Sequence, residues 1–108
     1  MKEFDVTIVG LGPAGGTLAN LLAMHDFSIL IIDREKSFYP LPRAVHFDDE
    51  IMRVFQTIGI TKEFLKHTII NKGTKFVNSK DKVILDWPRP KKITDNGWYP
   101  SCLIYTSP

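Results

Sequence analysis

Four residues near the start of the chain have the types and the spacing to hold a dinucleotide. Gly10, Gly12 and Gly15 form a Gly-x-Gly-x-x-Gly pattern, and Asp33 follows at the distance at which an acidic side chain meets a ribose. Gly10 permits a tight turn, Gly12 lets the backbone approach a diphosphate, and Gly15 lets a helix lie close to a strand. The Asp33 carboxylate would accept hydrogen bonds from ribose hydroxyls and would repel a 2′-phosphate.

The segments around these residues predict the elements that such a site requires. The apolar run 6–9 predicts a buried parallel strand, residues 13 to about 24 predict a helix, and residues 28–33 predict a second strand. A helix that starts at Pro13 would direct the free N–H groups of its first turn, near Ala14, at an anion. We therefore expect a Rossmann-like βαβ dinucleotide-binding unit; the alternative is a glycine turn that serves packing only.

The remainder of the chain predicts a small α/β domain. Residues 34–47 read as a proline-containing loop, residues 49–58 as an amphipathic helix capped by Asp48 or Asp49, and residues 61–66 as a short amphipathic turn. Residues 75–78 and 83–86 predict a small β-hairpin, and residues 103–105 a further strand. A length of 108 residues favours a single domain, residues 1–108.

Composition excludes several function classes. The apolar content of 44%, the charged content of 24% and the net charge of +2 give no reason to expect a nucleic-acid or membrane partner. The single cysteine, Cys102, predicts no disulfide framework, catalytic thiol or metal site, and it favours a cytoplasmic location. His46 reads as a structural or solvent-facing histidine rather than an acid or base. The sequence thus offers no catalytic residue.

Arg43 is the charged side chain of greatest interest in the proline loop. Its guanidinium could pair with diphosphate oxygens in a bidentate way that lysine cannot reproduce; the alternative is a surface arginine. The loop also carries the pattern that makes the sequence specific. Residues 5–23, 31–35 and 42–60, and more loosely 97–108, resemble the N-terminal part of the flavin-dependent aromatic hydroxylases, single-component FAD monooxygenases. The similarity is strongest to the branch that includes 3-(3-hydroxyphenyl)propionate hydroxylase.

The resemblance implies a cofactor and a reaction. The cofactor would be FAD, and the full-length enzyme would insert one oxygen atom of O2 into the ring of a small phenolic substrate, using NAD(P)H to reduce the flavin. The residues beside the cofactor would be Gly10, Gly12, Pro13, Ala14, Gly15, Asp33, Arg34 and Arg43.

The same resemblance implies that the fold is incomplete relative to the family. The later Asp-Gly and Gly-Asp motifs of such enzymes do not occur in these 108 residues. We therefore expect the isolated chain to be inactive and to self-associate through unpaired sheet edges. Two other functions remain open: a stand-alone adenine-nucleotide-binding module without catalysis, and a fragment of an NAD-dependent dehydrogenase.

Overall fold

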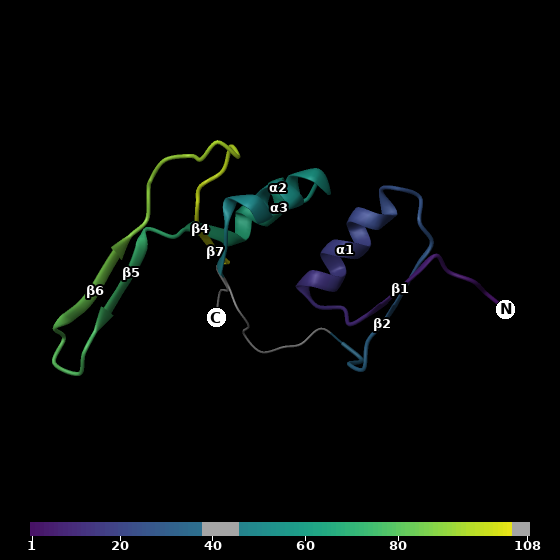
Figure 1. Ribbon diagram of the computed structural model, residues 1–108, viewed down its shortest axis with the longest axis horizontal. Coiled ribbons are helices and arrows are strands. Elements are labelled where there is room, and N and C mark those ends of the chain that lie inside the picture. The colour runs from purple at the N-terminus through teal and green to yellow at the C-terminus, as the bar shows by residue number, and fades with distance from the viewer. Residues whose placement is uncertain (38–45, 105–108) are drawn as a thin grey trace. The chain divides into compact units, whose positions relative to one another are not determined.

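The computed structural model describes residues 1–37 and 46–104, and its internal contacts divide the chain into two units, Met1–Pro42 and Arg43–Pro108. The first unit contains the expected βαβ arrangement: strand β1 (Val6–Val9), helix α1 (Pro13–Ala23) and strand β2 (Ile29–Ile32), shown in purple to blue in Figure 1. The two strands are parallel, and Val6 is paired with Ile29 and Val9 with Ile32. The prediction of a Rossmann-like unit is thus confirmed.

Helix α1 covers one face of the β1–β2 pair. Ile8 on the strand and Ala19 on the helix are both 8% exposed. Because side chains alternate along a strand, Val9 lies on the other face, where it is 80% exposed. One face of this small sheet is therefore covered, and the other is open among the described residues.

A polar contact closes the end of the unit opposite the glycine turn. The Asp5 carboxylate accepts hydrogen bonds from the Ser28 backbone N–H at 2.8 Å and from the Ser28 hydroxyl at 2.6 Å. These bonds lower the pKa of Asp5, so the carboxylate is ionised at neutral pH. The contact fixes the start of β2 beside the start of β1.

The second unit is built around a three-stranded antiparallel sheet in the order β3–β7–β4. Its elements are β3 (His46–Phe47), α2 (Asp49–Thr57), α3 (Thr61–Phe64), the 3-10 turn η1 (Leu65–His67), β4 (Thr68–Ile70), β5 (Gly73–Val77), β6 (Val83–Pro88) and β7 (Cys102–Ile104). The helix after the proline loop, the short turn after it and the last strand are where the sequence predicts them. Strands β3 and β4 are not predicted, because two or three residues carry no detectable alternation.

Aromatic side chains form the core of the second unit. Phe47, Met52 and Cys102 are buried, and the Phe64 ring lies 5.0 Å from the Phe47 ring and 4.6 Å from the Phe55 ring, both in edge-on geometry. Met52, at 1% exposed, is the deepest apolar side chain of α2. Cys102 packs in this core at 6% exposed, and its burial raises the pKa of the thiol.

The expected hairpin is present as a separate two-stranded sheet, β5–β6. Thr74 pairs with Trp87 and Phe76 with Leu85, and an irregularity in the register falls between Phe76 and Val77. Figure 1 shows this hairpin extending from the end of β4, drawn in green. None of the helices within residues 1–37 and 46–104 has the length and apolar character of a membrane span.

Candidate dinucleotide-binding site

The glycine turn leaves β1 at its carboxyl end. The Gly10 N–H donates to the Ile32 carbonyl at 2.7 Å, which extends the pairing of the two strands by one more bond. Gly10 has a φ of +107°, in the region that side-chain-bearing residues rarely adopt. The chain can therefore turn sharply into α1 directly after the strand.

Gly15 and Gly12 are required for different reasons. A Cβ at Gly15 would lie 2.1 Å from the Gly10 carbonyl oxygen and 3.3 Å from Cγ2 of Ile8, so only glycine allows this approach of helix and strand. A Cβ at Gly12 would meet no atom of the chain within 4 Å. Packing therefore explains Gly15 but not Gly12, which matches the need for a ligand to approach the backbone at that position.

Helix α1 begins without a side-chain cap. Gly12 occupies the capping position, Pro13 follows, and no acidic side chain lies in the first turn. The Gly16 N–H donates to the Gly12 carbonyl at 2.9 Å, so the preceding amides of Ala14 and Gly15 are the first-turn donors that helix geometry leaves without an intrahelical acceptor. Two N–H groups and the positive end of the helix dipole are thus available to an anion.

Asp33 joins the end of β2 to the glycine turn. Its Oδ2 accepts from the Leu11 N–H at 2.6 Å, and its Oδ1 accepts from the Glu35 N–H at 2.8 Å. The Glu35 N–H and then the Leu11 N–H lower the pKa of this carboxyl group, so it carries a full negative charge at neutral pH. Each carboxylate oxygen can accept a second bond, which leaves capacity for ribose hydroxyls.

The bond from Leu11 to Asp33 is the contact that sequence reasoning missed. The motif assigns Asp33 to the ribose alone, but in the structure the same carboxylate also holds the turn between β1 and α1. A backbone donor has no signature in residue type, so only the proximity of the two strand ends could have suggested it.

Of the two arginines predicted near the cofactor, Arg34 and Arg43, the structure describes only Arg34. Arg34 follows Asp33, its side chain is 92% exposed, and its Nε donates to the Glu35 carboxylate at 3.1 Å. An exposed pair of this kind contributes little to stability, so it leaves the guanidinium free to rearrange toward a ligand. Arg43 lies outside the described residues.

The structure therefore brings together most of the predicted site. The residues at the carboxyl ends of β1 and β2 are Gly10, Gly12, Pro13, Ala14, Gly15 and Asp33, with Arg34 next in the chain. A parallel strand, a glycine turn, an uncapped helix start and an acidic residue after the second strand define a dinucleotide-binding unit.

His46 has a structural partner in the second unit. Its Nε2 lies 2.7 Å from the hydroxyl of Ser101, which is 1% exposed and also accepts from the Asn71 side chain at 3.0 Å. The three side chains connect β3 to the segments that precede β5 and β7. In residues 1–37 and 46–104, no group of three or more His, Cys, Asp or Glu side chains is placed to hold a metal ion.

The comparisons with known proteins agree with the class of site that this geometry defines. The model of the FAD binding domain family matches residues 3–104, and the chain belongs to that family. FAD is accordingly the cofactor of the family site, and the resemblance to the flavin-dependent aromatic hydroxylases is confirmed.

Two curated relatives show how much of a full-length protein the chain represents. It is 45% identical to a probable NADH-specific resorcinol 4-hydroxylase of Rhodococcus jostii over 96% of this chain and 19% of the relative. It is 39% identical to a 3-(3-hydroxy-phenyl)propionate/3-hydroxycinnamic acid hydroxylase of Mycolicibacterium gilvum over 82% of this chain and 16% of the relative. The chain thus spans less than one fifth of the length of these relatives.

Solved structures confirm the fold. A p-nitrophenol 4-monooxygenase from Pseudomonas putida aligns with a TM-score of 0.74 at 22% identity, over 92% of this chain and 25% of the other. A probable FAD-dependent monooxygenase from Pseudomonas aeruginosa aligns with a TM-score of 0.70 at 16% identity, over 94% of this chain and 26% of the other. The chain therefore has the fold of the corresponding segment of FAD-dependent monooxygenases.

Proposed function

We propose that this chain supplies the adenosine and diphosphate part of the FAD site of an aromatic-ring hydroxylase. The observation that carries the proposal is the hydrogen bond between Asp33 and the Leu11 N–H, which sets the acidic residue beside the glycine turn. On this proposal residues 1–108 are part of one FAD-binding domain, and its cofactor-binding residues are Gly10, Gly12, Pro13, Ala14, Gly15, Asp33, Arg34 and Arg43.

Each group of residues has a separate role in holding FAD. The amides of Ala14 and Gly15 would donate to the diphosphate at the start of α1, while Gly12 would let the phosphates approach the backbone. Asp33 would accept from the ribose hydroxyls with the lone pairs that Leu11 and Glu35 do not use. Arg34 and Arg43 would add positive charge beside the phosphates.

The reaction we propose for the whole enzyme is hydroxylation of a small phenolic substrate. Relatives are named for resorcinol and for 3-(3-hydroxy-phenyl)propionate, both phenols. A bound flavin would supply the oxygen chemistry with NAD(P)H as the reductant, and the protein would position the flavin and exclude water. Because the chain spans less than a fifth of those relatives, we expect no turnover from the isolated chain.

A titration with FAD, AMP and NAD tests the binding role. Binding of all three ligands is followed by calorimetry, and the visible spectrum reports the flavin bands, with Asp33→Ala as the test variant. We expect FAD and AMP to bind alike, with unchanged flavin bands and an affinity loss of about tenfold or more in Asp33→Ala, because hydrogen bonds to a charged group are lost. Glu3→Ala is the matched control, since it removes an exposed carboxylate before β1.

The outcomes of the titration separate the competing functions. Selective binding of NAD would favour a dehydrogenase fragment. Binding of none of the three, with the fold intact, would overturn the proposal for this chain.

We further propose that the isolated chain self-associates through the open face and edges of β1 and β2. Val9 and Ile32 are paired neighbours on that face and are 80% and 47% exposed. An unpaired, apolar two-stranded sheet is a template for further pairing. Sedimentation should show a mass that rises with concentration, and Val9→Lys should reduce it.

The control for this experiment is Leu18→Lys, which changes an apolar side chain of α1 that is 46% exposed. This variant should associate like the unmodified chain, because it leaves the sheet unaltered. A monodisperse monomer with a high melting temperature would contradict the proposal.

A further inference from the structure

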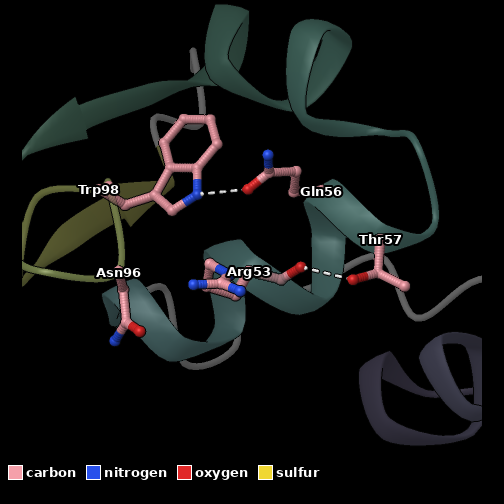
Figure 2. Close-up of a pocket in the computed structure, with 6 residues that line it drawn as sticks. Arg53, Gln56, Thr57, Asn96 and Trp98 are labelled. Atoms are coloured by element: carbon pink, nitrogen blue, oxygen red, sulfur yellow. Dashed lines mark hydrogen bonds between the residues drawn. The ribbon is translucent and has the colours of Figure 1, made fainter.

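A second polar site lies within the C-terminal unit, between α2 and the loop at residues 94–98. It is an open pocket of about 490 Å³, lined by Arg53, Gln56, Thr57, Asn96, Gly97 and Trp98, and it is shown in Figure 2. Its volume falls in the range of small-molecule sites. None of these residues belongs to the glycine turn or to the residues assigned above to FAD.

Two anchor points fix the loop across one face of α2. The Asp49 carboxylate accepts from the Thr94 hydroxyl at 2.6 Å and from the Asn96 amide at 2.7 Å. About two helical turns further along α2, the Trp98 indole N–H donates to Oε1 of Gln56 at 3.1 Å, the dashed line at the top of Figure 2. The pocket lies between these two anchors.

The loop is also closed on itself. The Thr94 N–H donates to the Trp98 carbonyl at 2.9 Å, and the Gly97 N–H donates to the Thr94 carbonyl at 2.8 Å. Gly97 has a φ of +84°, a conformation that glycine adopts without strain. The walls of the pocket are therefore set by the chain itself, which reduces the ordering cost of binding.

Arg53 is the cation of this pocket, and it forms no ion pair with either carboxylate in the first turn of α2, Asp49 or Glu50. Arg53 is one helical turn after Asp49, but the Asp49 carboxylate is held by Thr94 and Asn96. Within the part of the chain that the structure describes, no carboxylate oxygen lies within 4.0 Å of the Arg53 guanidinium. Figure 2 shows this side chain on the same side of α2 as Trp98 and Asn96.

We propose that this pocket binds small aromatic carboxylates, with the carboxylate on Arg53 and the ring against the Trp98 indole. A planar guanidinium matches the two oxygens of a carboxylate, and an indole face favours contact with another planar ring. The indole N–H already donates to Gln56, so Trp98 offers its ring and not its hydrogen-bond donor. This site is independent of the FAD function proposed above.

Affinity at such a site is modest. Arg53 is exposed, and an exposed ion pair alone contributes little to binding. The ring contact must therefore add to the charge contact, and we expect a dissociation constant on the order of 1 mM. A ligand that lacks either the charge or the ring should bind detectably more weakly.

A benzoate titration of the ¹⁵N-labelled chain tests this proposal through the indole N–H signals of Trp98 and Trp87. We expect a saturable shift of the Trp98 signal alone. Arg53→Gln should weaken the apparent affinity by up to about fivefold, the most that an exposed ion pair contributes. Arg53→Lys keeps the charge and loses the planar guanidinium, so its benzoate affinity should lie between those of the unmodified chain and Arg53→Gln. Acetate and benzamide, which lack the ring and the charge respectively, should each bind more weakly than benzoate.

The chain contains a matched control, an arginine beside a tryptophan that does not line this pocket. The Arg89 guanidinium lies 4.7 Å from the centre of the Trp87 ring. Arg89→Gln should leave the benzoate response of Trp98 unchanged. Equal shifts at both tryptophans would overturn the proposal. So would an unaltered benzoate affinity in an Arg53→Gln variant whose ligand-free Trp98 signal keeps its position, or equal affinity for benzoate and either control ligand.

Discussion

Helices α1 and α2 begin in opposite ways. At the start of α2 the Asp48 carboxylate accepts from the Ile51 N–H at 3.0 Å, and Asp49 and Glu50 lie in the first turn. At the start of α1, Gly12 and Pro13 provide no side-chain acceptor and no negative charge. The chain completes one helix end with its own carboxylates and provides none at the other.

This difference indicates how a helix start that is capped by its own side chains differs from one that could bind an anion. A side-chain cap contributes about 1 kcal/mol, and acidic residues in the first turn add a few tenths more. Helix α1 has neither a side-chain cap nor an acidic residue in its first turn, and a bound diphosphate would supply the missing hydrogen bonds and charge. The stability of the N-terminal unit should therefore rise with FAD concentration, while that of the α2 start should not.

The largest expected effect comes from the close approach of α1 to β1. Gly15→Ala would place a Cβ 2.1 Å from the Gly10 carbonyl oxygen, so the helix must move away from the strand. Overpacking of this kind costs about 1–3 kcal/mol, and FAD binding should be lost because the turn is displaced. Thermal unfolding and the FAD titration measure the two effects.

The adjacent residue provides the control for this substitution. A Cβ at Gly16 would lie 3.9 Å from Cδ1 of Leu11, an ordinary contact. Gly16→Ala should therefore stabilise the helix by about 0.5–1 kcal/mol and leave FAD binding intact. If both variants bound FAD equally well, the packing role assigned to Gly15 would be wrong.

A second substitution gives α1 the negative charge that α2 already has. Ala14→Glu places a carboxylate in the exposed first turn of α1. We expect the ligand-free chain to gain about 0.3–1 kcal/mol of stability, while FAD binds about tenfold more weakly because the carboxylate repels the diphosphate. Urea unfolding and the FAD titration check the two opposite changes, with Ala14→Gln as the uncharged control. If stability and FAD affinity both rose in Ala14→Glu, the start of α1 would not be the diphosphate-binding end that distinguishes it from α2.

The dinucleotide unit could be predicted from the sequence because each of its parts is local. The apolar run of β1, the three glycines and Asp33 lie within one continuous segment whose order fixes the topology. The β5–β6 hairpin is predictable for the same reason, since a short polar turn joins its strands.

The sheet β3–β7–β4 and the pocket beside α2 could not be predicted because their parts are distant in the sequence. His46 in β3 pairs with Leu103 in β7, and Asp49 meets Thr94. Trp98 and Gln56 likewise carry no local pattern that would associate them. The amphipathic pattern of α2 does not show which of its apolar side chains is buried deepest: Ile51 is 41% exposed, whereas Met52 is 1% exposed.

A smaller effect is expected at the start of α2. Asp48→Ala removes the side chain that accepts from the Ile51 N–H, and it should lower the free energy of unfolding by about 1 kcal/mol. FAD affinity should be unchanged, because this cap has no part in the proposed cofactor site. Tryptophan fluorescence in urea reports the loss, since both tryptophans lie in the C-terminal unit. A loss of FAD affinity as large as that of Ala14→Glu would contradict the distinction between the two helix starts.

The smallest effect separates two aspartates by their response to pH. Hydrogen bonds lower the pKa of Asp33, from the Glu35 and Leu11 amides, and of Asp49, from the Thr94 and Asn96 side chains. A lowered pKa in the folded state means stability that is fully present at neutral pH and is lost as the pH falls below about 4, through the folded-state pKa. Both groups should therefore contribute to acid unfolding.

FAD should distinguish these two aspartates. The amide signal of Leu11 reports the titration of Asp33, and the side-chain amide signal of Asn96 reports that of Asp49. Ribose hydroxyls that donate to Asp33 would favour its charged form further, so FAD should move the Leu11 midpoint to lower pH and leave the Asn96 midpoint unchanged. AMP carries the same ribose and should act in the same direction. If both midpoints moved together, the effect of FAD would be a general stabilisation of the fold, and Asp33 would serve the turn alone.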